Sequence, residues 1–149
     1  MTVRLRPATH ADADRLLAWR NDADAVHFSA SGAAVAPEEH RRWIESRLGR
    51  SSPRLWVAES GGTAVGMVRL DVDDGVGVVS IAVAPEHRGH GLSGEMLGAL
   101  VDIARADGDV ERMAARVSAD NLASLRAFER AGFETVSRDY GWLELSRAL

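Results

Sequence analysis

The chain has 149 residues, of which 46% are hydrophobic, and its 18 basic and 22 acidic side chains leave a formal net charge of -4. This length and apolar content predict one packed domain over residues 1–149 rather than a disordered chain. The acidic balance argues against a nucleic-acid binder that relies on bulk positive charge, and the absence of cysteine excludes disulfides, thiolate metal sites and a cysteine nucleophile.

The first half of the chain predicts a strand, two helices and two more strands. In chain order these are a strand at residues 3–6, helices at 11–21 and 37–48, and strands at 55–59 and 63–71. Pro7 ends the first strand, while Pro37 and Gly49 mark the start and the stop of the second helix. The stretch DADAVHFSASGAAVA between the helices is rich in small residues, and we expect it to be irregular.

The second half predicts alternating strands and helices. In chain order these are a strand at residues 76–83, a helix at 91–106, a strand at 112–117, a helix from Asp120 or Asn121 to Ala131, and strands at 134–138 and 142–145. Residues 76–83 are almost continuously apolar, so this strand should be central and covered on both faces. The complete order is β-α-α-β-β-β-α-β-α-β-β in one α/β domain.

A glycine-rich string, Gly89-His90-Gly91-Leu92-Ser93-Gly94, follows the fourth predicted strand. Glycine tolerates positive φ, and the N-terminus of the next helix favours an anion, so the string predicts a phosphate site. A Rossmann fingerprint would follow the first strand of a βαβ unit, with an acidic residue at the end of the second strand. Neither Asp107 nor Asp109 has that position, which argues against NAD or FAD. A P-loop would need Gly-Lys-Ser/Thr, whereas Glu95 follows the glycines here.

Two segments resemble the signatures of the GCN5-related N-acetyltransferases, the GNAT family. The pattern V-x-P-x-x-R-G-x-G-x at residues 83–92 resembles motif A, and NLASLRAFERAGF at residues 121–133 resembles the second signature. They stand in the family's order and at about its spacing, although Ser93 replaces the usual Gly or Ala. The resemblance implies a GNAT-type domain with a mixed, mostly antiparallel seven-stranded sheet and helices on both faces. It also implies acetyl-CoA as the donor substrate and no metal.

The resemblance further implies which residues contact coenzyme A. The phosphate loop would bind mainly through backbone N–H groups and would comprise Arg88, Gly89, His90, Gly91, Leu92 and Ser93. In the family the pantetheine arm fills a gap beside the central strand, so the backbone of Ile81 and Val83 would pair with it. Asn121 is the usual side-chain contact from the last helix, unless it serves as a plain helix cap, and Ser124 is a candidate at the phosphate end.

The implied reaction is direct transfer of an acyl group, acetyl in the simplest case, from a thioester to a primary amine. It needs a neutral amine, a polarised carbonyl and a proton for the leaving thiolate. A backbone N–H near residues 81–83 can polarise the carbonyl. Many family members have a tyrosine acid where this chain has Phe128, so the single tyrosine, Tyr140, is the candidate acid or else a surface aromatic. Ser80 shares a strand face with Ala82 and is either an aid to proton relay through water or a satisfied buried hydroxyl.

The N-terminal half resembles the branch that contains ribosomal-protein and amino-sugar-nucleotide acetyltransferases. The runs Trp19-Arg20-Asn21 and Glu39-His40-x-x-Trp43 resemble the amino-sugar-nucleotide group in particular. The residues implied for binding a small-molecule amine are Arg20, Asn21, His27 and His40. Either histidine could be a base near neutral pH. Polyamine, aminoglycoside, amino-acid and protein N-terminal acceptors stay open.

Two other functions stay open as well. The chain could be a non-catalytic acyl-CoA-binding regulatory module, which Phe128 keeps possible. It could also take its acyl group from another carrier such as an aminoacyl-tRNA, although the intact loop and the acidic charge argue against this. No apolar run approaches the ~20 residues of a membrane span, and the segment MTVRLRPATH lacks the apolar core of a signal peptide. We therefore expect a cytoplasmic monomer or homodimer without a membrane partner.

Overall fold

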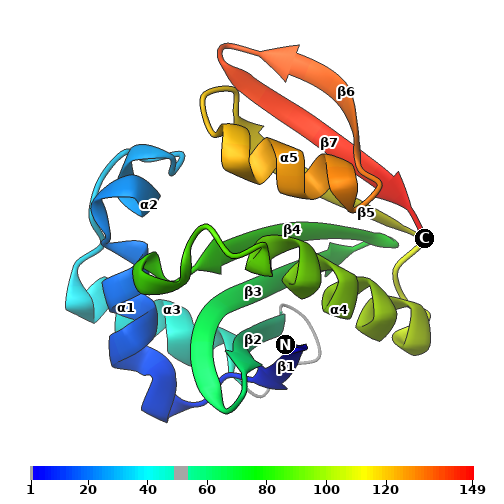
Figure 1. The fold of residues 1–149 in the computed structure, drawn as a ribbon. Helices are drawn as coiled ribbons and strands as arrows, with labels where there is room; N and C mark the ends of the chain where they lie inside the picture. The colour runs from blue at the N-terminus through cyan, green and yellow to red at the C-terminus, as the bar shows by residue number, and fades with distance from the viewer. Residues whose placement is uncertain (1, 49–53) are drawn as a thin grey trace.

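The computed structural model describes residues 2–48 and 54–149 (Figure 1). The elements in chain order are β1 (Val3–Pro7), the short 3-10 helix η1 (His10–Asp12), α1 (Ala13–Arg20), α2 (Ala23–His27), α3 (Pro37–Arg47), β2 (Arg54–Ser60), β3 (Thr63–Asp73), β4 (Val76–Val83), the 3-10 helix η2 (Pro85–His87), α4 (Leu92–Asp107), β5 (Arg112–Ser118), α5 (Leu122–Arg130), β6 (Glu134–Asp139) and β7 (Trp142–Ala148). All seven predicted strands form. Gly49, the predicted stop of the second helix, lies outside the described residues.

The strands form one mixed sheet in the order β1-β2-β3-β4-β5-β7-β6. Every neighbouring pair is antiparallel except β4 and β5, which are parallel. The β4–β5 register covers only residues 76–78 of β4 opposite 112–114 of β5. The C-terminal ends of these two strands therefore diverge (Figure 1), and residues 79–83 have no described strand partner on that edge.

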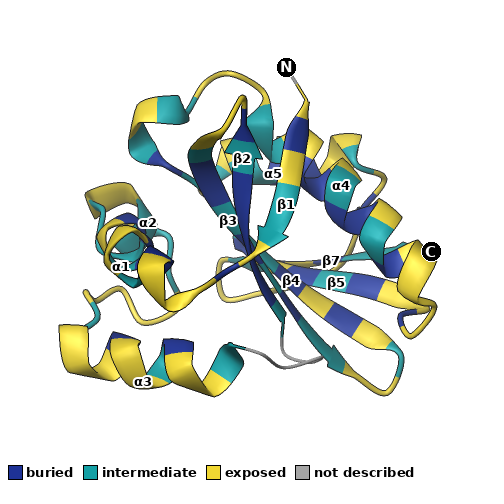
Figure 2. Cartoon of the chain, turned by 90° about the horizontal axis from the view of Figure 1, so that it is seen from below, coloured by how far each residue is buried: buried dark blue, intermediate teal, exposed yellow. Residues whose placement is uncertain are grey.

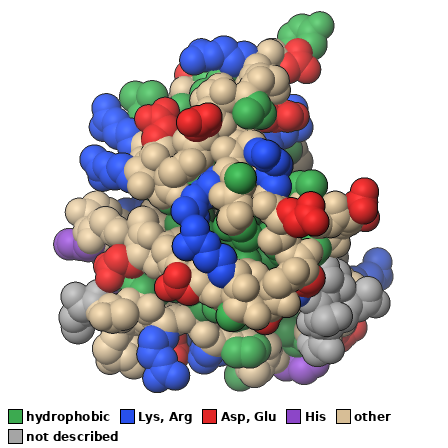
Figure 3. Space-filling view, turned by 90° about the vertical axis from the view of Figure 1, so that its right-hand side faces the viewer, with side chains coloured by type: hydrophobic (Ala, Val, Ile, Leu, Met, Phe, Trp, Pro, Cys, Tyr) green, Lys and Arg blue, Asp and Glu red, His purple; other side chains and the backbone are tan. Residues whose placement is uncertain are grey.

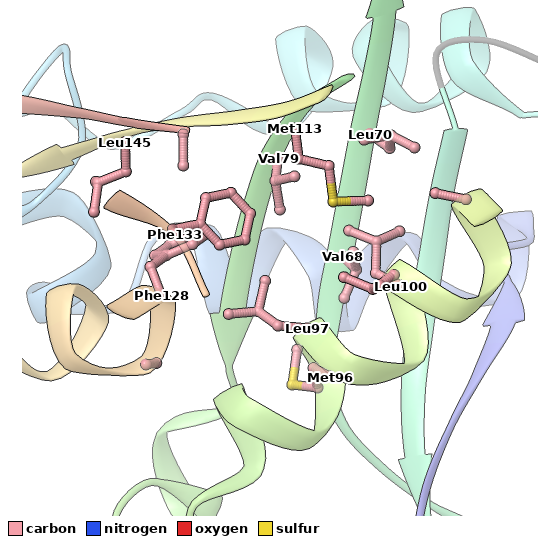
Figure 4. Close-up of a cluster of buried hydrophobic side chains, with 14 of the residues drawn as sticks. Val68, Leu70, Val79, Met96, Leu97, Leu100, Met113, Phe128, Phe133 and Leu145 are labelled. Carbon is pink, nitrogen blue, oxygen red and sulfur yellow. The ribbon is translucent and has the colours of Figure 1, made fainter. Parts of the chain in front are cut away.

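Helices cover the sheet on both faces: α1, α2 and α3 lie on one side and α4 on the other (Figure 2). Strand alternation determines which side chains reach each layer. Met67 of β3 joins Ile44 of α3 in a smaller apolar cluster. The larger cluster lies beneath α4 and α5 (Figure 4) and includes Val68, Leu70, Val79, Met96, Leu97, Leu100, Met113, Phe128, Phe133 and Leu145.

Two local predictions are wrong. β4 is central, as predicted, but it is not covered on both faces along its whole length, because Val76 and Val78 are 37% and 42% exposed. The reason is that α3 packs against β2 and β3 in the smaller cluster, which includes no residue of β4. The segment predicted as irregular contains the short helix α2. Its cap is Asp22, whose carboxylate accepts from the N–H groups of Asp24 and Ala25 at 3.2 and 3.3 Å.

Candidate active site

The glycine-rich loop leads from β4 into α4 and has the backbone that its sequence predicts. Gly89 and Gly91 have φ of 83° and 73°, the left-handed region that side chains with a Cβ rarely adopt. A Cβ on either glycine would meet no atom within 4 Å, so backbone conformation, not lack of space, requires glycine at both positions. The first N–H groups of α4 have no partner within the helix. This open row of donors at a helix N-terminus fits a phosphate group.

Arg88 holds the loop against α2. Its guanidinium donates to Asp22 at 2.9 Å and to Asp24 at 3.3 Å. The Arg88 hydrogen bond is the main reason that the pKa of Asp22 lies below its ordinary value. The side chain of Arg88, which the resemblance places in the phosphate loop, is thus paired with two carboxylates of the chain itself.

The backbone positions predicted for the pantetheine arm lie along the diverging edge. Ile81 and Val83 of β4 pair with Val68 and Gly66 of β3 on one side, whereas their other edge faces the divergence. Across it, Asn121 caps α5, and its side-chain Oδ1 accepts from the N–H of Ser124 at 3.3 Å. The cap that was left open as an alternative for Asn121 is therefore present.

Phe128 and Tyr140 have opposite surroundings. Phe128 is 2% exposed and packs edge-on against Phe133 with ring centroids 5.0 Å apart, so α5 presents no proton donor there. Tyr140 is 97% exposed at the tip of the β6–β7 hairpin. The carbonyl of Gly141 accepts from the N–H of Ala119 at 2.8 Å. This bond ties the hairpin tip to the C-terminal end of β5, on the far side of the divergence from β4.

Ser80 lies on the other face of β4, toward α1 and α3, in a group that we name the Arg69 site: Trp43, Arg47, Arg69, Asp71 and Ser80. Arg69 stands opposite Ser80 on β3 and donates to its Oγ at 2.8 Å. Arg47 donates to Asp71 at 2.5 Å, while the Nε of Arg69 lies 3.5 Å from the other oxygen of that carboxylate. Both guanidinium groups approach the Trp43 ring, at 4.7 Å for Arg47 and 5.8 Å for Arg69.

The Arg69 site is poorly solvated. Burial lowers the pKa of Arg69, Asp71 opposes this shift, and the positive charge of Arg47 adds to it. Neither Arg47 nor Arg69 was predicted from the sequence to be a site residue. The available signal was the alternation in GMVRLDVD, which places Met67, Arg69 and Asp71 on one face of an otherwise apolar strand.

The four residues predicted to bind the acceptor separate into different surroundings. Asn21 clamps the backbone of Val35, donating at 2.8 Å and accepting at 2.7 Å. Arg20 donates to Ser31 at 3.3 Å. His40 is 5% exposed, and burial, followed by the charge of Arg20, lowers its pKa. His27 lies on α2, edge-on to its neighbour Phe28.

His40 and the Arg69 site share one aromatic ring, because the His40 imidazole lies 5.6 Å from Trp43. The structure thus brings His40 and Ser80 to the α1–α3 side of the sheet, where Arg20 acts on His40 through its charge. Asn21, by contrast, has its amide engaged in holding a loop.

The face of the molecule shown in Figure 3 is mixed in charge. On the face shown in Figure 3, arginine and acidic side chains are interspersed with apolar ones. Among the described residues, no three His, Cys, Asp or Glu side chains gather in a way that could hold a metal ion. No helix in residues 2–48 and 54–149 is long and apolar enough to cross a membrane.

Residues 2–134 match the family model described as the acetyltransferase (GNAT) domain. The chain is 28% identical to an L-methionine sulfoximine/L-methionine sulfone acetyltransferase of Pseudomonas paraeruginosa, covering 98% of this chain and 92% of that protein. It is 28% identical to a ribosomal-protein-alanine N-acetyltransferase from Brucella melitensis of known structure, with a TM-score of 0.80 and coverage of 98% and 99%. An aminoglycoside acetyltransferase solved with coenzyme A is 25% identical, with a TM-score of 0.82 and coverage of 99% and 95%.

Proposed function

The chain belongs to the GNAT family of N-acetyltransferases, whose donor is acetyl-CoA, and we propose that it acetylates the primary amine of a small molecule by direct attack. The observation that carries this proposal is the placement of the left-handed Gly89–Gly91 loop at the N-terminus of α4, beside the diverging ends of β4 and β5. The loop at the helix N-terminus accounts for a phosphate site, and the divergence of β4 from β5 leaves a backbone edge for an extended ligand.

The residues present fit coenzyme A. The backbone N–H groups of the loop and of the first turn of α4 would receive the pyrophosphate. The free edge of Ile81 and Val83 would pair with the amides of the pantetheine arm. Asn121 and Ser124, at the start of α5, would contact the cofactor from the opposite side. Bound acetyl-CoA supplies an activated acetyl thioester.

Each step of acetyl transfer is then assigned to a group of the chain itself. A backbone N–H near Ile81 would polarise the thioester carbonyl. The amine nitrogen forms a bond to the carbonyl carbon, the carbon–sulfur bond breaks, and the thiolate takes a proton. We assign that proton to Tyr140 on the rim of the divergence. Ser80 accepts from Arg69, which leaves its own O–H to donate to and orient a water; this water would take up the amine proton and pass it to bulk solvent.

The acceptor is proposed as a small molecule because relatives over most of this chain carry such substrates in their names, methionine sulfoximine in one and an aminoglycoside in another. An amino-sugar nucleotide, the acceptor that the Trp19-Arg20-Asn21 run implies, stays a prediction.

The test is thiol release from acetyl-CoA over a panel of amines, with mass spectrometry of the product. The chain contains no lysine, so acetylation of its own side-chain amines cannot imitate turnover. We expect thiol release that requires an amine and a product heavier by one acetyl group. Coenzyme A binding with no amine-dependent release would instead identify a non-catalytic acyl-CoA-binding module.

The glycine-rich loop proposed to bind the donor is tested separately with Gly91→Val. The affinity of this variant for coenzyme A is measured by calorimetry. A β-branched residue at φ 73° is strained, and we expect about a ten- to hundredfold loss of affinity. Gly98→Ala is the matched control, since it adds a methyl group to α4 in open space where φ is not positive. Normal affinity in Gly91→Val would show that the loop does not hold the donor.

A further inference from the structure

We propose that the acceptor is an amine with a carboxylate close to its nitrogen, an amino acid in the simplest case, and that Arg69 binds this carboxylate. The inference rests on the proposed function, because it names the substrate class of that same site. It comes from the charge, the solvation and the position of the Arg69 site.

The charges of the Arg69 site do not balance. Arg47 and Arg69 both form their ion pairs with Asp71, and no other acidic side chain pairs with either in the described part of the chain. Ser80, the remaining polar contact of Arg69, is neutral. Two positive charges thus share one negative charge, and a bound anion would neutralise the excess positive charge.

The excess charge lies where water compensates it poorly. The Arg47 side chain is 14% exposed and that of Arg69 is 28% exposed. The Nε atoms of both arginines are buried and donate no hydrogen bond within the described residues. An uncompensated charge in such surroundings is unfavourable, which makes a structural role alone a poor explanation. The exposed part of Arg69 still leaves a path for a ligand.

The position of Arg69 indicates how far the anion lies from the reacting nitrogen. Its guanidinium contacts Ser80, the residue next to Ile81, whose backbone is proposed to polarise the thioester. An anion on Arg69 would therefore lie beside the attacking amine. In an α-amino acid, one carbon separates the nitrogen from the carboxyl group, whereas a sugar ring separates the amine of an amino-sugar nucleotide from its phosphates. The proximity favours a carboxylate.

The same face offers an apolar surface to the rest of the acceptor. Val78 stands opposite Asp71 in the β3–β4 register and is 42% exposed. An aliphatic side chain could cover it and gain the free energy of apolar burial. Amino acids with apolar side chains are therefore the first acceptors to test.

The experiment compares each common L-amino acid with its own carboxamide, using thiol release from acetyl-CoA. The carboxamide keeps the amine and the side chain but loses the negative charge. Its amine is also less basic, so a larger fraction of it is neutral near neutral pH, and amine protonation by itself would favour the amide over the acid. We expect kcat/KM at least about tenfold higher for the best acid than for its amide.

Arg69→Gln should lower kcat/KM for that acid by about ten- to hundredfold, mainly through KM. It should lower kcat/KM for the amide much less, because both acceptors lose the hydrogen bond from Arg69 to Ser80 but only the acid loses the partner of its carboxylate. The affinity for coenzyme A should be nearly unchanged. Arg69→Lys keeps the charge without the planar fork and should restore part of the loss. If Arg69→Gln fails to fold, as judged by circular dichroism, kcat/KM for the acid and for its amide are compared in Arg69→Lys instead.

Arg112→Gln is the matched control. Arg112 also lies on a strand and donates to a serine across the sheet, to Ser146 at 2.7 Å. It pairs with Val76, about 13 Å along β4 from Ser80 at ~3.3 Å per residue. This variant should keep the preference for the acid.

The outcomes separate the two proposals. Equal rates for acids and amides, or faster turnover of an aminoalkyl phosphate such as phosphoethanolamine, would overturn the carboxylate site while acetyl transfer stands. Calorimetry on the protein saturated with coenzyme A gives the second readout. Arg69-dependent binding of the acids, with no thiol release from any amine of the panel, would support the carboxylate site and refute acetyl transfer. If no acid is turned over or bound, the carboxylate site is overturned; acetyl transfer is overturned as well only if no amine of the panel gives thiol release.

Discussion

At the scale of single residues, Phe128 and Tyr140 divide two roles: Phe128 packs in the core, and Tyr140 is the proposed proton donor. The Phe128 ring is buried against Phe133, whereas the phenol of Tyr140 is open to solvent on the hairpin that ends beside β5. A phenol is protonated at neutral pH and can transfer its proton to a departing thiolate. Many family members have a tyrosine at the position of Phe128. Phe128 can pack in the core at this position, but it has no hydroxyl to donate a proton.

Tyr140→Phe tests the acid role by removing one oxygen. Loss of a general acid typically costs about 10²–10⁴-fold in rate. Because water can replace Tyr140 in part, we expect kcat to fall by at least about tenfold. The 97% exposed ring makes an effect on folding small, and affinity for coenzyme A should not change. The measurement is kcat at saturating donor and acceptor with product release shown not to limit it. A wild-type kcat would assign the proton to water or to Ser124.

At the scale of elements, the contact of Arg88 with the N-terminus of α2 joins the loop proposed to bind the donor to the side of the sheet proposed to bind the acceptor. Asp22 both caps α2 and pairs with Arg88. If Arg88 contacts the pyrophosphate of coenzyme A, it must exchange these carboxylates for the phosphate. Asp22 and the phosphate then compete for one guanidinium group.

Asp22→Asn tests this competition, because asparagine still caps a helix but carries no charge. We expect coenzyme A to bind about two- to fivefold more tightly, the range set by the loss of one partly exposed surface ion pair. Asp14→Asn is the control, since it makes the same change in net charge at an exposed residue of α1. Calorimetry gives both affinities. Unchanged or weaker binding in Asp22→Asn would mean that Arg88 serves to hold α2 and not the donor.

At the scale of the whole molecule, periodicity predicted the order of strands and helices along the chain, and the gap beside the central strand followed from the family resemblance. Helix α2 was missed because its five residues are too short for an apolar stripe, and its signal was the cap at Asp22. The Arg69 site was missed for a different reason. Its residues come from α3, β3 and β4, and only the register of the folded sheet brings Arg69 opposite Ser80. Local patterns predict elements, whereas such a site depends on contacts across the sheet.

The pH dependence of folding also belongs to the whole chain, and His40 is the residue that should control it near neutrality. Burial and the charge of Arg20 lower its pKa from the ordinary 6.5, so the unfolded chain binds a proton more readily than the folded one. The free energy of unfolding should therefore fall as the pH drops below about 6.5. The pKa of Asp12 is lowered by its hydrogen bond to Arg6, so that contribution is lost only at more acidic pH.

The measurement is urea unfolding of the wild type, His40→Gln and His10→Gln between about pH 7.5 and 5, which brackets the ordinary histidine pKa. His40→Gln removes the titrating group from the core, so its stability should change less over this range than that of the wild type. His10 is exposed, and its variant should follow the wild-type curve. If the three curves run parallel, His40 is protonated as easily in the folded protein as in the unfolded chain. Its imidazole would then be charged, rather than neutral, beside the Trp43 ring at mildly acidic pH.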